Sequence, residues 1–272
     1  MAKLNRSGTD PYRFNPQRGF NKMGKSRAAL NHLWPSLLVL AIIAGLILFI
    51  WYPYPFLQFK DTGKFSLVLV LSAGFIGPAM TWLFYREGKS KRALAFDLVV
   101  ILIIQTAAFA WGGYALYQNR PYFMVFTVDR FEVLTMRDVD LSTVTDSKLL
   151  NKPVAGPILL YASMPTDSQV FQNLLKEVMF EGKPDLQYRP EFWSLYAEKR
   201  QLALSPALPL ETLRSARPES LQAIDKLVKN NGGDINRLKY VPGMVQNGQF
   251  AAILNADSGE VIDTLVIDPW VN

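Results

Sequence analysis

The sequence contains no cysteine and a single histidine, His32, among its 272 residues. These absences exclude disulfides, iron–sulfur clusters, thiolate nucleophiles and multi-histidine metal sites. Charged residues are also scarce, because they make up 19% of the chain, against about 25% in an average globular protein. Apolar residues make up 50%. The composition therefore argues against a simple soluble domain.

The net charge of +6 conceals two halves of opposite sign. Residues 1–117 contain 13 Lys and Arg against 4 Asp and Glu, whereas residues 118–272 contain 16 against 19. A basic protein invites a role in nucleic-acid binding. Here, however, the positive charge lies in short segments beside apolar runs, which is typical of membrane topology. We therefore expect a lipid bilayer, and no nucleic acid, as a partner.

Three apolar runs, at 33–52, 65–85 and 96–117, are each long enough to cross about 30 Å of hydrocarbon as a helix. The only charge within them is Asp97, which we expect to cap the third span or to pair with a cation of the preceding loop. A cleaved signal peptide is the alternative for the first run. That run is too long for a signal core and has no small-residue cleavage pattern after it, so we interpret it as an uncleaved anchor.

Lysine and arginine in the connecting segments predict the orientation of these spans. The N-terminal tail carries seven of them and the loop at 86–92 carries four, whereas the loop between the first two spans carries only two. The tail and the second loop are therefore expected in the cytoplasm. In a bacterium this makes the chain a multi-pass inner-membrane protein with a periplasmic C-terminal part.

The expected organisation is a basic cytoplasmic tail at 1–31, three transmembrane helices within 32–117, and a periplasmic α+β domain with a central sheet at 118–272. The alternating apolar pattern of the domain begins with one long strand at 121–136. Helical spacing and capping signals predict further helices, and a turn at 256–259 predicts a terminal hairpin. The expected helices span 166–180, 190–204 and 218–229, with a short helical turn at 210–216. The expected later strands are 158–163, 250–255 and 261–267, and the segments 238–241 and 244–246 are expected as short strands or a loop.

Small and polar residues inside the spans are the candidate partner-binding residues. Ala73 and Gly77 share one helix face and permit close helix approach, and Pro78 is expected to kink the second span. Gln105 places an amide within the membrane, where it needs a hydrogen-bond partner. Two interpretations stay open for this set: packing among the spans of this chain, or a groove for a partner's transmembrane helix.

The C-terminal part offers few residues for chemistry. It contains no histidine, no Walker loop and no glycine-rich dinucleotide motif. Asp138 and Asp140 could share a strand face and bind a cation, but two acids alone are a weak calcium signal. A Ser142–Lys148 catalytic pair is weaker still. We therefore expect no catalytic residues, no metal and no cofactor, and hence a protein that is not an enzyme.

Several segments together resemble a known family. They are Trp51-Tyr52-Pro53, Gly77-Pro78, Phe96-Asp97-Leu98, Leu116-Tyr117, Arg120-Pro121, the run Val128-Asp129-Arg130-Phe131-Glu132-Val133, the run 256–261 and Ile267-Asp268-Pro269-Trp270. This set resembles the type IV pilin accessory proteins of the TfpX/TfpZ kind. The chain departs from that pattern in its longer N-terminal tail and in lacking an acidic residue in the first half of the second span.

The resemblance implies a non-enzymatic accessory protein that supports the assembly or dynamics of a cognate type IV pilin. Its implied partners are the major pilin or other pilus assembly components. The alternative is a membrane-tethered module that senses or binds a periplasmic ligand. A third hypothesis, an enzyme that modifies pilin, is disfavoured by the absence of a catalytic cluster.

Overall fold

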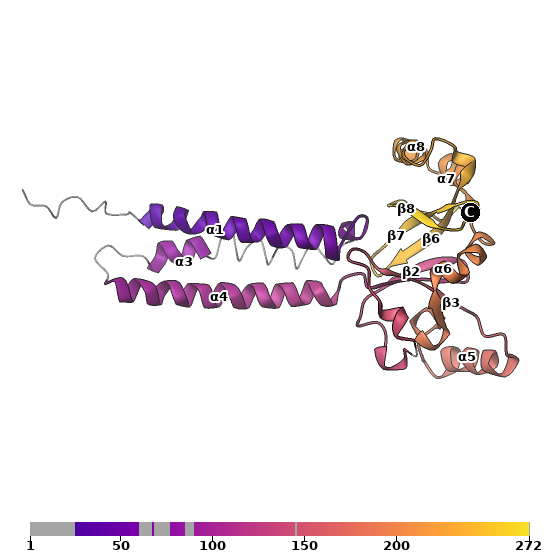
Figure 1. Ribbon diagram of the computed structural model, residues 1–272, viewed down its shortest axis with the longest axis horizontal. Coiled ribbons are helices and arrows are strands. Elements are labelled where there is room, and N and C mark those ends of the chain that lie inside the picture. Colours follow the sequence, from indigo (N-terminus) through magenta and orange to yellow (C-terminus); the bar gives the residue numbers. More distant parts are fainter. Residues whose placement is uncertain (1–24, 60–66, 68–76, 85–89, 145, 272) are drawn as a thin grey trace, which may run out of the picture.

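The computed structural model describes residues 25–59, 67, 77–84, 90–144 and 146–271. A bundle of long helices forms one part of the molecule, and a sheet domain lies at one end of that bundle (Figure 1). The predicted basic tail up to residue 24 and most of the predicted second span, including Ala73, lie outside the described residues.

Two helices account for the first and third predicted spans. α1 (Lys25–Leu46) continues into a π-helical turn, η2 (Ile47–Trp51), and α4 is Lys91–Gln118. The stretches Leu33–Trp51 and Arg92–Gln118 are long and apolar enough to cross a membrane, and almost none of either is buried inside the protein. α3 (Gly77–Phe84) contacts both of these helices (Figure 1). These features fit a membrane-anchored α+β protein, whereas a third complete span is not confirmed.

The start of α4 corrects one expectation. Ser90 is its N-cap, and the Ser90 side chain accepts a hydrogen bond from the Ala93 backbone N–H at 3.3 Å. Asp97 therefore does not cap the helix; it lies almost two turns inside it. A serine before the first helical residue is a standard cap because its oxygen satisfies a backbone N–H that has no intrahelical partner.

The domain is built on a mixed sheet with the strand order β4-β3-β1-β2-β6-β7-β8, and β5 pairs separately with β6. The β1–β3 and β2–β6 pairs are parallel and the other pairs are antiparallel. The strands are β1 (Phe123–Thr127), β2 (Arg130–Leu134), β3 (Ile158–Ala162), β4 (Trp193–Leu195), β5 (Leu208–Pro209), β6 (Leu238–Val245), β7 (Gly248–Asn255) and β8 (Val261–Leu265).

The expected single strand at 121–136 is wrong, because this segment is the β1–β2 hairpin. Thr127 pairs with Arg130, which leaves a connection of two residues. Val128 has φ of +51°, and the Asp129 N–H bonds back to the Thr127 carbonyl at 2.6 Å. The sequence hides this turn, since a β-branched residue rarely adopts positive φ and no glycine marks the position.

The expected helix at 190–204 is also wrong. The segment forms η8 (Pro190–Phe192), β4, α6 (Tyr196–Lys199) and η9 (Arg200–Leu204). Pairing of β4 with β3 and burial of Trp193 against Phe123, at a ring distance of 5.0 Å, override the helical pattern.

The two segments within 238–246 that are expected as short strands or a loop are instead the one strand β6. Pro242 fits inside it because this is where one edge of β6 changes partner, from β5 at Tyr240 to β2 at Gly243.

The other helices expected in the domain and its terminal hairpin are confirmed. α5 (Ser168–Phe180) begins at an Asp167 cap, and the terminal hairpin is β7–β8. α7 is Leu210–Ala216, and η10 (Pro218–Ser220) leads into α8 (Leu221–Asn230). The short 3₁₀ segments η3 (Phe56–Gln58), η5 (Leu141–Thr143), η6 (Ser147–Leu150), η7 (Leu186–Tyr188) and η11 (Ile235–Arg237) complete the connections.

Three apolar clusters hold the domain together. Helices α7 and α8 cover Tyr240 and Ile253 at one end of the sheet, and α5 lies at the opposite end, near the cluster around Phe123 (Figure 1). The third cluster is centred on Phe126 and Phe250, and it includes residues of the segment 52–59, which directly follows the first apolar helix. That segment therefore belongs to the core of the domain, although it lies between two predicted spans.

Candidate partner-binding site between the apolar helices

A cavity of about 490 Å³ lies between α1, α3 and α4. Most of its wall is apolar, but each helix contributes a buried polar side chain: Ser36 from α1, Thr81 from α3 and Gln105 from α4. These three side chains are 8%, 5% and 6% exposed. The site is therefore a largely apolar hollow into which each of the three helices places a buried polar side chain.

Other large apolar side chains of the bundle lie on its outer surface, away from this cavity. Trp34, Phe49 and Ile103 are 74%, 75% and 62% exposed on the outer surface of the bundle. In water this arrangement would be costly, whereas in hydrocarbon it is favourable, because polar side chains then turn toward one another and apolar ones face the lipid. Gln105 thus lies on the inner side of α4, because the apolar side chains beside it in the sequence are the ones compatible with lipid.

The predicted partner-binding residues are distributed unevenly around the cavity. Gln105 lines it, as expected for an amide in the membrane. Gly77 and Pro78 stand at the start of the described part of α3, one turn before Thr81. Ala73 lies outside the described residues, and so does the part of the span in which Pro78 could produce a kink.

Sequence reasoning missed Ser36 and Thr81. Their signal was the same as that of Gln105, a polar side chain within an apolar run, but a hydroxyl is weaker evidence than an amide because it can bond to its own helix backbone. Asn31 and Asp97 line the cavity toward the first residues of α1 and α4. This places a carboxyl group at that end, the only acid among the lining residues of the described cavity.

The helices and the sheet domain are joined by specific contacts. The Tyr52 hydroxyl donates to the Leu116 carbonyl of α4 at 2.8 Å. Phe56 and Phe59 pack against Phe250 of β7, with ring centroids 6.1 and 6.4 Å apart. A partner that moves the bundle would therefore also act on the sheet, because well-packed cores transmit displacement.

A second feature lies at the turn of the β1–β2 hairpin, where two of the segments that carry the family resemblance, 128–133 and 267–270, meet. Arg130 pairs with Asp129 at 2.9 Å, and its guanidinium carbon is 5.3 Å from the centre of the Trp270 ring. Arg217 holds Asp268 at 2.7 Å and the Trp270 carbonyl at 2.6 Å. The C-terminal segment is thus fixed beside the hairpin, a contact that the sequence did not predict.

The acids considered for cation binding are used locally instead. Asp138 accepts from the Thr135 backbone N–H at 2.6 Å, and Asp140 accepts from the Ser142 N–H at 3.0 Å and from its hydroxyl at 2.7 Å. The Ser142 bonds lower the pKa of Asp140. Both residues follow β2 rather than sharing a strand face. Within the described ranges no group of three or more metal-ligating side chains occurs.

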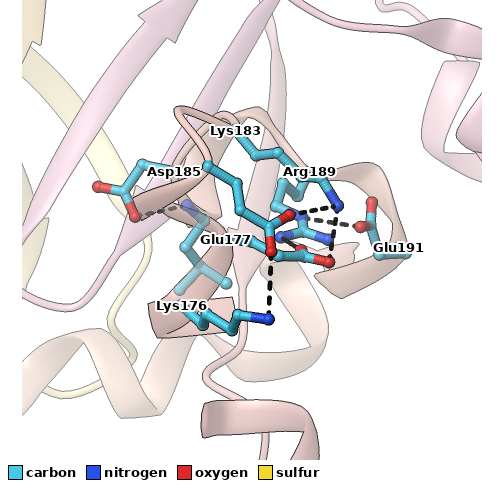
Figure 2. A network of polar contacts seen from close by, with 8 residues as sticks. Lys176, Glu177, Lys183, Asp185, Arg189 and Glu191 are labelled. Atoms are coloured by element: carbon cyan, nitrogen blue, oxygen red, sulfur yellow. Dashed lines mark hydrogen bonds and ion pairs between the residues drawn. The ribbon is translucent and has the colours of Figure 1, made fainter. Parts of the chain in front are cut away.

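The densest polar network in the domain also has a structural role (Figure 2). Glu177 of α5 accepts from Lys183 at 2.9 Å and from Arg189 at 2.6 Å, and these bonds lower its pKa. Arg189 also bonds Glu191 at 2.8 Å. Because each of these carboxylates is engaged by a cation, the network closes the loop after α5.

Comparison with known proteins places this architecture in a family. The model of the family "Fimbrial assembly protein FimB" matches residues 20–59, which include α1 and the segment that packs on the sheet. A curated fimbrial assembly protein of Dichelobacter nodosus (serogroups C1 and C2) is 36% identical over 110 residues, covering 40% of this chain and 82% of that relative. The chain belongs to the fimbrial assembly protein family.

Two further fimbrial assembly proteins of Dichelobacter nodosus extend the match. The serogroup I protein is 28% identical over 181 residues, which is 66% of this chain and 70% of the relative. The serogroup E1 protein is 27% identical over 208 residues, which is 75% of this chain and 76% of the relative. No solved structure matches. The resemblance to type IV pilus accessory proteins is thereby confirmed, and the role is one in pilus assembly.

Proposed function

We propose that this fimbrial assembly protein is a non-enzymatic accessory of the bacterial inner membrane that binds a cognate type IV pilin through its apolar helices. The observation that carries the proposal is the cavity lined by Ser36, Thr81 and Gln105 in an otherwise apolar bundle. The bundle would be multi-pass, with a cytoplasmic N-terminus and a periplasmic sheet domain.

The size and chemistry of the cavity support a protein segment as the occupant. A volume of about 490 Å³ accommodates a few side chains of a docking helix, not a whole helix. Polar side chains at fixed places in an apolar wall would favour one partner helix over others, where apolar contact alone discriminates poorly. Since helix and domain are joined through the segment 52–59, one partner could contact both, which raises the effective concentration of the second contact.

The alternative of a periplasmic ligand sensor receives less support from the domain. The cavity beneath the segment 52–59 is about 60 Å³, enclosed by Tyr52, Phe56 and Asn119 among others. Small-molecule sites commonly span about 300–1,000 Å³. This cavity is too small for a metabolite.

The test is site-specific photo-crosslinking in cells that assemble pili. A photoreactive side chain at Thr106 faces the cavity, whereas the same group at Ile103 faces outward on the same helix. We expect pilin to be captured from position 106 and not from position 103. Equal capture at both positions, or capture of no pilin at either, contradicts the proposal. A change of pilin mass in a deletion strain would contradict its non-enzymatic part.

A further inference from the structure

The junction between the helices and the sheet domain contains an arginine without an acidic partner. Arg120 follows α4 by two residues and is only 7% exposed. Its Nε is fully enclosed and has no hydrogen-bond partner, and among the described residues no carboxylate lies within ion-pair distance of its guanidinium. Burying an unpaired guanidinium is costly unless another anion or a polarisable surface compensates.

Aromatic rings supply part of that compensation. The guanidinium carbon of Arg120 lies 3.6 Å from the centre of the Tyr117 ring and 5.1 Å from that of Tyr122. Tyr117 in turn packs edge-on against Trp51, at 5.4 Å, where the first apolar helix ends. Trp and Tyr at the ends of apolar helices mark the headgroup layer of a membrane. Arg120 is therefore placed at that layer.

A second cation approaches the same place. The Lys152 Nζ lies 5.8 Å from the Tyr122 ring and donates to the Gly156 carbonyl. Burial lowers the pKa of Lys152, and the nearby charge of Arg120 lowers it further. Two cations that repel one another, with no acid shared between them among the described residues, favour an anion from outside the chain.

The loop that carries Lys152 lies against the segment that follows the first apolar helix. Gly156 lies against Pro53, with 3.8 Å between the Pro53 Cγ and the position that a Cβ on Gly156 would occupy. Pro53 follows the first apolar helix directly, so the loop is held at the end of the bundle. Its tip, Val154, is 84% exposed. An apolar tip beside two cations matches the acyl chains and the phosphate of a lipid.

We propose that Arg120 and Lys152 bind the phosphate of an anionic phospholipid in the leaflet next to the sheet domain, with Val154 inserted among the acyl chains. The bound lipid supplies the counter-charge that the described residues do not, and it fixes the sheet at one height above the bilayer. This inference requires only that the two apolar helices cross a membrane, and it is independent of pilin binding.

The experiment uses the full chain in nanodiscs of phosphatidylcholine with one-quarter phosphatidylglycerol, and native mass spectrometry to count the lipids that stay bound on release. The variants are Arg120→Gln and Lys152→Gln, with Arg120→Lys to retain the charge. Arg130→Gln is the matched control, because Arg130 also stacks on an aromatic ring but pairs with Asp129 at the distal hairpin.

The wild type is expected to retain phosphatidylglycerol over phosphatidylcholine about tenfold, equivalent to about 1.4 kcal/mol. Arg120→Gln should abolish this preference, Lys152→Gln should reduce it, and Arg120→Lys and Arg130→Gln should largely preserve it. A preference unchanged in Arg120→Gln overturns the site.

A thermal-unfolding arm separates the other sources of the effect. Short-chain phosphatidylglycerol should raise the melting temperature of the wild type and not that of Arg120→Gln. If inorganic phosphate raises the melting temperature of the wild type equally, then a free anion occupies the site. That result overturns the proposal of a bound lipid. If Arg120→Gln lowers the melting temperature by the same amount with and without anionic lipid, then Arg120 acts only by stacking on the tyrosine rings. That result also overturns the lipid site.

Discussion

The helical bundle and the sheet domain distribute polarity in opposite ways. In the bundle, Trp34, Phe49 and Ile103 are exposed while Gln105 is buried. In the domain, Phe126 and Phe250 are fully buried, and of the described charged side chains only Arg120 is buried. This contrast is expected of one chain that folds in two solvents. Water favours polar side chains at the surface of the domain, whereas hydrocarbon favours apolar side chains at the surface of the bundle.

The segment 52–59 shows where the change of solvent occurs. It follows an apolar helix directly, yet its aromatic side chains pack in the aqueous domain rather than toward lipid. Since the apolar stretch ends at Trp51, we expect the boundary near that residue. The following predictions test this comparison, beginning with the largest expected effect.

Phe250→Ala should destabilise the domain by about 3–5 kcal/mol, because it removes a buried ring from the contact with Phe56 and Phe59. The control is Phe49→Ala, the same change at an exposed position of the first helix. Urea unfolding of the full chain in detergent, followed by near-ultraviolet circular dichroism, measures both. Equal losses of stability would show that the two regions do not differ as described.

Gly248→Ala should cost about 1–3 kcal/mol, since overpacking a tight core forces its side chains from their preferred positions. A Cβ at residue 248 would lie 2.2 Å from the Phe59 ring, whereas one at Gly113 in α4 meets nothing within 4 Å. Gly113→Ala is therefore the control in the same unfolding assay. A neutral Gly248→Ala would mean that Phe59 is not fixed on the sheet.

Gln105→Leu should change stability by only about 0.6 kcal/mol, the average worth of a hydrogen bond between membrane helices. Its effect on pilus assembly should be much larger, if the amide serves a partner. Counting pili by electron microscopy at equal protein level measures this, and Gln105→Asn should restore part of it. Normal piliation in Gln105→Leu would exclude the amide from partner binding.

Glu177→Gln should have the smallest effect, a slight loss of stability at neutral pH that disappears in acid. Hydrogen bonds from Lys183 and Arg189 hold the folded pKa of Glu177 below its ordinary value of 4.5. The stabilisation is therefore present above that value and is lost as the pH falls through the lower folded pKa. Melting temperatures of the full chain between pH 7 and pH 3 should converge with those of the variant below about pH 4.5. Glu219→Gln, at an exposed glutamate, should run parallel to the wild type throughout.

Much of the domain could be predicted from local patterns. The Asp167 cap, the amphipathic spacing of α8 and the turn between β7 and β8 are each encoded in a few neighbouring residues. The failures concern non-local effects. A turn at Val128 without glycine, and the strand β4 within a helical pattern, are decided by pairing with distant strands. The same holds for the candidate site: Gln105 was evident, whereas Ser36 and Thr81 became significant only through their shared cavity.

The sequence by itself determined which stretches are compatible with hydrocarbon, how charge is divided between the two halves, and which family the chain resembles. These are sums over local composition, because transfer of a helix into lipid depends on the side chains that it carries. Only the tertiary structure decided that the segment 52–59 enters the core and that Arg120 is buried beside Lys152 without an acid. Such contacts join residues distant in sequence, so no local pattern records them.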